Sequence, residues 1–270
     1  MYPVLISFGP VEIYTYGVFL ALAFYLSVQW AVKMGTQRGF NEDMILNLAV
    51  VSILSAIFGA RVTYVYVYWD QFFTNSYWDV FKVWQGGLVF YGGLIGGVIG
   101  GITYWWLRRM SILAMLDVAV MSVSLGHAIG RIGCFFYGCC YGKIIPLGSA
   151  WIQLGHQFPH LDGIRYPVQI LASLGNILIF LLLLFVIKKA KRPATVTIVY
   201  CYVYGLFRFM MELLRDDPRG TILGVSHLST SQTISLLILL AGICLHAYMT
   251  FGAGRKLQLS SENCKVVPTK

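Results

Sequence analysis

The sequence predicts an all-α membrane protein, a bundle of about seven transmembrane helices, from its composition and from the lengths of its apolar runs. Of its 270 residues, 58% are hydrophobic and only 11% are charged, whereas an average soluble domain carries about 25% charged residues. So few polar side chains cannot cover a globule of this size, which argues against a soluble enzyme and against a disordered chain. The net charge of +9 does not indicate a nucleic-acid partner, because most basic residues stand in short clusters between the apolar runs.

Seven apolar runs reach the length of about 20 residues that a helix needs to cross a bilayer. The chain starts with MYPVLISFGPVEIYTYG, which has neither a positively charged start nor a small-residue cleavage site, so we expect the first run to be a retained span. Short connections predict that the third and fourth spans, and the fifth and sixth, form hairpins. The predicted spans are 11–32, 45–68, 88–107, 112–133, 167–188, 194–214 and 230–251.

The distribution of basic residues predicts that the N-terminus lies outside and the C-terminus inside. In this orientation the inner segments contain twelve Lys and Arg residues and the outer segments five, which follows the positive-inside rule. Residues 134–166 then form the longest outer segment, and we expect a small head built from it and from the outer segments 69–87 and 215–229. Residues 1–254 are predicted to form a single transmembrane domain, followed by a polar inner tail, 255–270.

Three arginines, Arg61, Arg131 and Arg208, fall inside the predicted spans or at their edges. An arginine at the centre of a membrane helix costs about 2.5–3.5 kcal/mol on insertion scales. One interpretation is structural, since Glu212 follows Arg208 by four residues and can pair with it on one helix face. The other is a buried cationic site for an anionic ligand. A planar guanidinium suits phosphate, and the most available phosphate in a membrane is that of a phospholipid headgroup.

A glycine-rich run with a tyrosine, and a histidine, lie near these arginines in the sequence. The run 86–101 has eight glycines in sixteen residues, and six of them form two series spaced four apart, which lets helix backbones approach closely in lipid. Tyr91 lies just ahead of this smooth face and is either an interfacial tyrosine or a functional phenol. His127 lies one helical turn before Arg131, where it either packs or transfers a proton.

Three cysteines occur in the spacing C-x4-C-C, at Cys134, Cys139 and Cys140. A structural zinc site uses four ligands, commonly in two closely spaced pairs, so this spacing does not predict a metal site. A disulfide between Cys134 and either neighbour is one alternative. A nucleophilic cysteine whose thiol is acidified by Arg131 is another.

The segment HAIGRIGCFFYGCCYG (127–142) resembles the signature of the bacterial prolipoprotein diacylglyceryl transferases, which reads roughly G-R-x-G-N-F-x-N-x-E. The resemblance continues in the same order over nearly all of the chain, so the chain is identified as a divergent member of this family. The other motifs that carry it are Tyr16-Gly17, GARVTYV (59–65), WQGGLVFYGGLIGG (84–97), Asp117, YPVQ (166–169), YGLFRFMMELLRDDPRG (204–220) and LSTSQTIS (228–235).

The resemblance implies a multi-pass enzyme of the bacterial inner membrane with its N-terminus and its head in the periplasm. Its reaction would move the diacylglyceryl group of phosphatidylglycerol to the lipobox cysteine of a prolipoprotein signal peptide, which forms a thioether and releases glycerol phosphate. No cofactor and no metal are implied. Arg131 and Arg208 would stabilise the departing phosphate as fixed positive charges. The residues expected to contact phosphatidylglycerol are Tyr16, Arg61, Arg131, Gly133, Cys134, Arg208 and Glu212.

The departures from the family pattern concern groups that could move the thiol proton. Tyr91 stands where the family has histidine, and Cys134 and Cys139 stand where it has asparagine and glutamate. As a base at neutral pH, Tyr91 would need its pKa lowered from its ordinary value of about 10, and His127 is the other candidate. The predicted catalytic residues are therefore Arg131, Arg208, Tyr91 and His127.

Two other functions stay open from the sequence. The changed histidine, asparagine and glutamate positions are compatible with a divergent family member that uses another acceptor. The intramembrane arginines are also compatible with a non-catalytic protein that binds or transports phospholipid.

Overall fold

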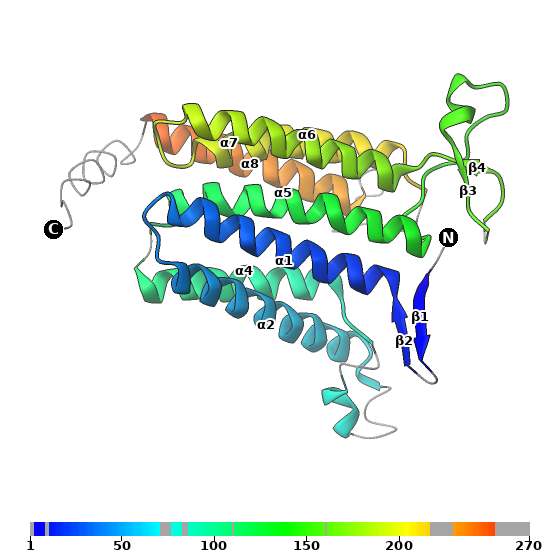
Figure 1. Ribbon diagram of the computed structural model, residues 1–270, viewed down its shortest axis with the longest axis horizontal. Coiled ribbons are helices and arrows are strands. Elements are labelled where there is room, and N and C mark those ends of the chain that lie inside the picture. Colours follow the sequence, from blue (N-terminus) through cyan, green and yellow to red (C-terminus); the bar gives the residue numbers. More distant parts are fainter. Residues whose placement is uncertain are drawn as a thin grey trace. The chain divides into compact units, whose positions relative to one another are not determined.

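The computed structural model describes residues 3–8, 11–70, 77–82, 86–109, 111–159, 161–216 and 229–251, so the predicted tail 255–270 lies outside the described residues. Seven α-helices account for most of what is described (Figure 1). They are α1 (Thr15–Thr36), α2 (Glu42–Val67), α4 (Phe90–Arg108), α5 (Ile112–Tyr137), α6 (Val168–Lys189), α7 (Thr195–Leu213) and α8 (Thr230–Phe251).

Six of these helices are long and apolar enough to cross a membrane, which makes the chain a multi-pass membrane protein. The helix α4 coincides with the third predicted run but is not among the six. Its glycines, tyrosines and tryptophans lower its hydropathy. The described residues thus support six of the seven predicted spans by length and composition.

The start of the chain differs from the prediction. The first helix begins at Thr15 rather than at residue 11, because the preceding residues form an antiparallel hairpin of β1 (Val4–Phe8) and β2 (Val11–Tyr14). Both strands are rich in valine and isoleucine, which favour an extended backbone. The apolar residues that suggested an earlier helix start therefore belong to a strand, and the prediction of an all-α fold omitted this hairpin.

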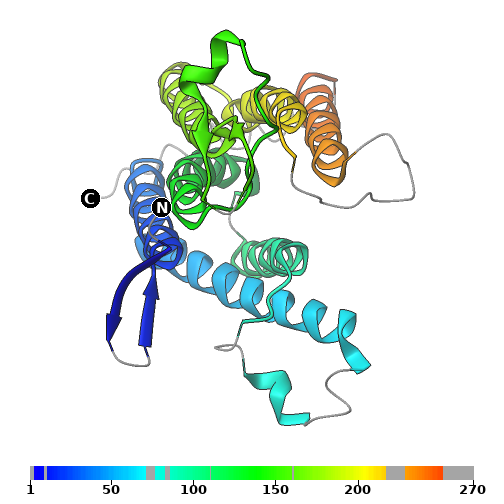
Figure 2. The same ribbon diagram turned by 90° about the vertical axis from the view of Figure 1, so that its right-hand side faces the viewer.

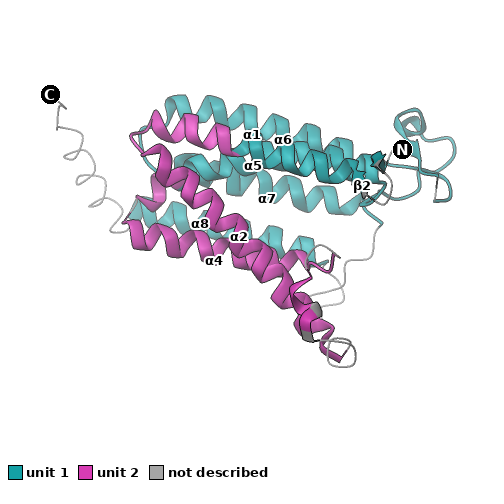
Figure 3. Cartoon of the chain, turned by 60° about the horizontal axis from the view of Figure 1, so that its bottom comes forward, with its two compact units in different colours: residues 1–27, 116–270 teal, residues 28–115 magenta. Residues whose placement is uncertain are grey.

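The chain divides into two compact units, Met1–Ser27 with Leu116–Lys270, and Val28–Met115 (Figure 3). In the second unit α2 packs against α4 through small residues. A Cβ atom added to Gly59 would meet the carbonyl oxygen of Gly92 and lie 3.0 Å from the Cα atom of Gly96. The backbones of the two helices therefore touch, and the prediction that these glycines permit close packing is confirmed.

In the first unit, α5, α6, α7 and α8 run side by side (Figure 2). The hydroxyl of Ser173 in α6 donates to the carbonyl of Ala128 in α5 at 2.8 Å. One carboxylate oxygen of Asp117 accepts hydrogen bonds from the backbone N–H and the hydroxyl of Thr197, at 2.8 and 2.7 Å. The first N–H groups of a helix have no partner within the helix, so Asp117 caps α7 from a neighbouring helix.

The N-terminal half of α1 packs against the last turns of α5. A Cβ atom on Gly133 would lie 2.9 Å from the Cβ atom of Phe19 and 3.4 Å from a ring carbon of Tyr16. The rings of Phe19 and Phe136 stack with centroids 5.4 Å apart. Gly133 is thus a point of close approach between two helices.

The predicted outer segment 134–166 forms a small head, but it starts later than expected. Helix α5 continues to Tyr137, so Cys134 lies in a helix rather than in a loop. The head contains the short strands β3 (His156–Gln157) and β4 (Ile164–Arg165), the 3-10 helix η3 (Ala150–Leu154) and the buried ring of Phe158. Arg165 ties the head to the end of α7, because its guanidinium donates to Asp216 at 2.7 Å.

Candidate functional site

A cluster of polar and charged residues in the first unit lies where α5 and α7 end and where α6 and α8 begin. His127 and Arg131, one turn apart in α5, are joined by a hydrogen bond of 3.1 Å from Nε of Arg131 to Nε2 of His127. The other ring nitrogen, Nδ1, lies 3.3 Å from the hydroxyl of Tyr204 in α7. The predicted pairing of His127 with Arg131 on one helix face is therefore present.

This hydrogen bond determines the tautomer of His127. An arginine Nε–H can only donate, so Nε2 of the imidazole must carry its lone pair and the ring proton must be on Nδ1. The Nδ1–H group then donates to the hydroxyl of Tyr204. The lone pair that His127 would use as a base is thus occupied by Arg131, and the ring fixes the orientation of the guanidinium.

Arg208 and Glu212 form the ion pair that their spacing predicted. The distance from Nη2 of Arg208 to Oε2 of Glu212 is 2.9 Å, and the two side chains are only 12% and 8% exposed. Two serines at the start of α8 complete the arrangement: Ser231 accepts from Arg208 at 2.7 Å, and Ser229 donates to Glu212 at 2.9 Å. Arg215 adds a longer ion pair to the same carboxylate, at 3.9 Å.

The resulting site is cationic. Arg131 and Arg208 interact electrostatically with each other, and Arg215 shares Glu212 with Arg208. Three guanidinium groups and one carboxylate leave these four residues with a net positive charge. Positive charge held by buried side chains in a low-dielectric environment acts strongly on an anion that develops negative charge.

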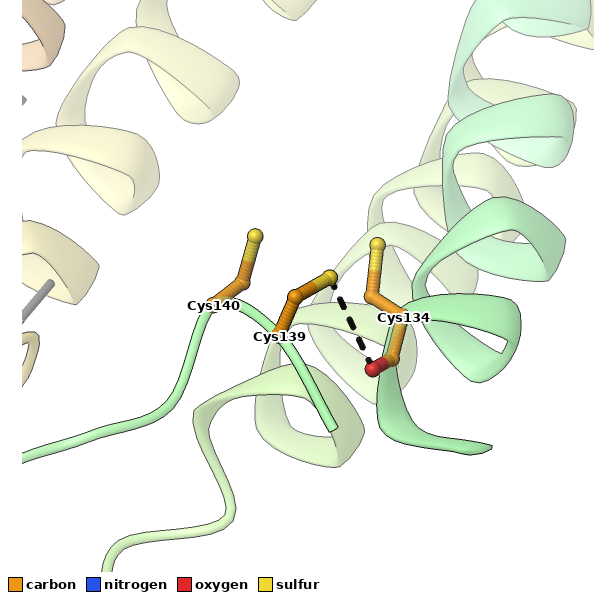
Figure 4. Close-up of side chains that lie close together, drawn as sticks. All are labelled: Cys134, Cys139 and Cys140. Carbon is orange, nitrogen blue, oxygen red and sulfur yellow. Dashed lines mark hydrogen bonds between the residues drawn. The ribbon is translucent and has the colours of Figure 1, made fainter. Parts of the chain in front are cut away.

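The three cysteines predicted to lie in one loop come together at the edge of this site (Figure 4). Cys134 lies in the last turns of α5, Cys139 and Cys140 follow that helix, and the three sulfur atoms all lie within 4.8 Å of one another. All three are free thiols. Hydrogen bonds with the thiols of Cys134 and Cys139, and the Arg215 guanidinium beside it, lower the pKa of the Cys140 thiol.

Tyr16 and Gly133 lie beside this cluster. Tyr16 interacts electrostatically with the three thiols and with Arg131, and its ring centroid is 6.2 Å from that of Tyr137. Gly133 packs against Tyr16 and Phe19, which gives it a role in helix packing. The structure thus brings Tyr16, Gly133 and the cysteines together, as expected of neighbouring residues in a site.

Arg61 and Tyr91 belong to the second unit. Arg61 is 8% exposed, and its guanidinium donates to the carbonyls of Val80 at 2.8 Å, Gly86 at 2.8 Å and Gly87 at 3.1 Å. These bonds favour the interpretation that Arg61 holds the backbone around α2 and α4. Tyr91 lies in the first turn of α4.

Several residues of the site were not predicted individually. Tyr204, Ser229, Ser231 and Arg215 occur within the family-like motifs of the sequence, and the contacts of Tyr204 and of the two serines join α7 to α5 or to the start of α8. Gln169 is a fifth, since its amide donates to the carbonyl of Cys139 at 2.8 Å. Tyr204 and Arg215 carried a local signal, because Tyr204 precedes Arg208 by one helical turn and Arg215 follows Glu212 by three residues.

Comparisons with known proteins cover most of the chain. Residues 3–248 match the family described as prolipoprotein diacylglyceryl transferase. The chain is 38% identical over 243 residues to the phosphatidylglycerol–prolipoprotein diacylglyceryl transferase of Clostridium tetani, which covers 90% of this chain and 96% of that relative. It is 34% identical over 235 residues to the transferase numbered 2 of Clostridium perfringens, with 87% and 90% covered. It is 32% identical over 254 residues to that of Oceanobacillus iheyensis, with 91% and 87% covered.

Proposed function

The chain belongs to the prolipoprotein diacylglyceryl transferase family and transfers a diacylglyceryl group from phosphatidylglycerol to prolipoprotein, and we propose that the acceptor atom is the thiol sulfur of the lipobox cysteine. The thiol loses its proton, and its sulfur attacks the glyceryl carbon that carries the phosphate. The carbon–oxygen bond to the phosphate breaks, and its electron pair leaves with the phosphate oxygen. The products are a thioether and glycerol phosphate.

The cationic site of the first unit supports this reaction. The phosphodiester of phosphatidylglycerol carries one negative charge, and the departing glycerol phosphate gains a second as the bond breaks. Fixed positive charge that interacts more strongly with the transition state than with the bound lipid accelerates the step. The contact chain from Tyr204 through His127 to Arg131, beside the Arg208–Glu212 pair, is the observation that carries this assignment.

The same geometry favours a positioning role for His127 over the role of base. A proton could reach Nε2 only if the hydrogen bond from Arg131 were given up. The cationic site of the first unit favours the thiolate form of the acceptor, and the role of Tyr91 as a base stays a prediction.

Variants of His127 test this division of roles. A glutamine side chain can place an oxygen near the position of Nε2 and accept from Arg131, whereas alanine cannot. We expect His127→Ala to lower the turnover number by roughly tenfold to a hundredfold through misplacement of Arg131, and His127→Gln to restore most of the activity with an unchanged pH–rate profile. If both variants lost activity equally, and the pH–rate profile no longer fell at low pH, His127 would be identified as the base instead.

We further propose that the protein lies in the bacterial inner membrane with its N-terminus and head in the periplasm. Twelve basic residues in the predicted inner segments against five in the outer segments support this orientation. The ends of α5 and α7 and the starts of α6 and α8 then all lie at the outer surface, where the signal peptide of a translocated prolipoprotein is available.

The acceptor is tested with purified protein, phosphatidylglycerol vesicles and a synthetic lipobox peptide, followed by mass spectrometry. We expect the peptide to gain one diacylglyceryl group at its cysteine, and the same peptide with serine in place of that cysteine to stay unmodified. Equal modification of the serine peptide would show that another acceptor atom is used.

A further inference from the structure

The three-cysteine cluster is held by the backbone in one defined arrangement. The chain turns back after Tyr137, and the N–H groups of Gly138 and Cys139 both donate to the carbonyl of Cys134, at 3.0 and 3.2 Å. Cys140 has a left-handed backbone with a φ of 64°, a conformation that residues other than glycine adopt at a cost. The buried Gln169 fixes the carbonyl of Cys139 from α6. These constraints turn three sulfurs to one side of the turn (Figure 4).

Three sulfur atoms in a triangle with sides of at most 4.8 Å match the donor set of a thiophilic cation. Zinc binds cysteine sulfur at about 2.3 Å, so sulfurs around a tetrahedral zinc ion lie about 3.8 Å apart. Closing the triangle to that size needs sulfur movements of at most about 1 Å. A disulfide would use two of the thiols and leave the third unused, and a bridge between the adjacent Cys139 and Cys140 would be strained. A single ion uses all three.

The charges around the cluster suit the same ligand. Three thiolates and one Zn²⁺ leave a net charge of −1, and the neighbouring cations offset it. The guanidinium of Arg215 lies beside the thiol of Cys140, and Arg131 interacts electrostatically with Cys134. The side chain of Arg215 is only 3% exposed, so its charge acts at close range in a poorly solvated place.

We propose that Cys134, Cys139 and Cys140 bind a zinc ion through three thiolates, and that the fourth coordination position accepts the thiol of the acceptor cysteine. Three protein ligands with one open position are typical of catalytic rather than structural zinc. A thiol that coordinates zinc is deprotonated, so its proton passes to the solvent and the site does not need a strong base. This zinc-bound acceptor rests on the proposed function. The bound sulfur attacks the glyceryl carbon, and the carbon–oxygen bond to the phosphate breaks. The thioether sulfur that forms is uncharged and a weaker ligand, so it leaves the ion.

The proposed zinc site also accounts for the departures of this chain from the family pattern. Cys134 and Cys139 replace the asparagine and glutamate of the family signature, and Tyr91 replaces its histidine. A chain in which metal coordination removes the thiol proton no longer needs a histidine to do so. The spacing C-x4-C-C did not predict this site because two of its ligands are adjacent in sequence, and only the turn after α5 shows that the three sulfurs meet.

The binding part is tested with full-length protein, purified in detergent under a thiol reductant, freed of metal by a chelator and titrated with cobalt(II) chloride. We expect one cobalt ion per chain with a near-ultraviolet sulfur-to-cobalt charge-transfer band that zinc chloride removes. Cys139→Ser should lose this band, and the matched control Cys244→Ser, at a cysteine outside the cluster, should keep it. The absence of the band in the wild-type protein, or a Cys134 disulfide in non-reduced peptide maps, would overturn the proposal.

The acceptor part is tested with the cobalt-loaded protein and the lipobox peptide. We expect the cysteine peptide, and not its serine counterpart, to change the visible cobalt spectrum, and we expect metal removal to lower transfer at least tenfold until zinc is restored. A cobalt spectrum that does not respond to the peptide would contradict the open fourth position. Full transfer activity of the metal-free protein would overturn the inference while leaving the proposed function intact.

Discussion

Replacing Arg131 with alanine is expected to lower the turnover number by about 10²–10³, the loss typical of removing one group that stabilises developing negative charge. The expectation follows from the place of Arg131, whose guanidinium is fixed by His127 and lies beside the Arg208 ion pair. Because the interaction strengthens as the phosphate gains charge, the loss should fall mainly on kcat and less on KM for phosphatidylglycerol.

Two further variants make this result interpretable. Arg131→Lys keeps the charge but lacks the fork of donors that binds phosphate and the Nε–H group that His127 accepts, so we expect intermediate activity. Lys189→Ala removes a positive charge at the opposite end of α6 and should leave the rate near that of the wild type. Full activity of Arg131→Ala would remove Arg131 from the mechanism.

Among the substitutions named here, Glu212→Gln should lower the free energy of unfolding the most, by about 3 kcal/mol. The carboxylate is shared by Arg208 and Arg215, and the side chains of all three residues are at most 12% exposed. Removing one partner of a buried ion pair leaves an uncompensated buried charge and typically costs about 3–5 kcal/mol, whereas removing both charges is often tolerated. We therefore expect a clearly lower Tm for Glu212→Gln and a partly restored Tm for the double variant Arg208→Met/Glu212→Gln, in which only Arg215 still lacks its ion pair with Glu212.

The same set of variants separates folding from catalysis. The double variant regains part of the lost stability but lacks the positive charge of Arg208, so its transfer rate should stay low although the protein is folded. Glu12→Gln, at an exposed carboxylate in β2, should change neither Tm nor rate. A double variant that is both stable and fully active would show that Arg208 serves the fold alone.

The helices were predicted well because their apolar length is a property of local sequence. Every predicted run coincides with an observed helix, and the largest error in a helix start, four residues at Thr15, arose where valine and isoleucine favour strands instead. The extension of α5 to Tyr137 mattered more. It moved Cys134 out of the predicted loop and placed its sulfur next to those of Cys139 and Cys140.

The sequence predicted the contacts of the site between residues one helical turn apart, and it did not predict the contacts between different helices. The spacing of Arg208 and Glu212, and of His127 and Arg131, gave two pairs that the structure contains. The serines that hydrogen-bond to Arg208 and Glu212 could not be found this way, because they lie at the start of α8 and not in α7. For Arg61 the sequence left both interpretations open, and only the carbonyls around its guanidinium favour the structural one.

The most direct test of the account is the stoichiometry of the reaction with phosphatidylglycerol labelled in its glycerol phosphate headgroup. The purified protein, the labelled lipid and the lipobox peptide are incubated together, and released glycerol phosphate is counted against diacylglyceryl-modified peptide. We expect one glycerol phosphate for each modified peptide, with both products lost together in Arg131→Ala. Labelled lipid that binds tightly but is never cleaved would contradict the account and indicate a phospholipid-binding protein instead.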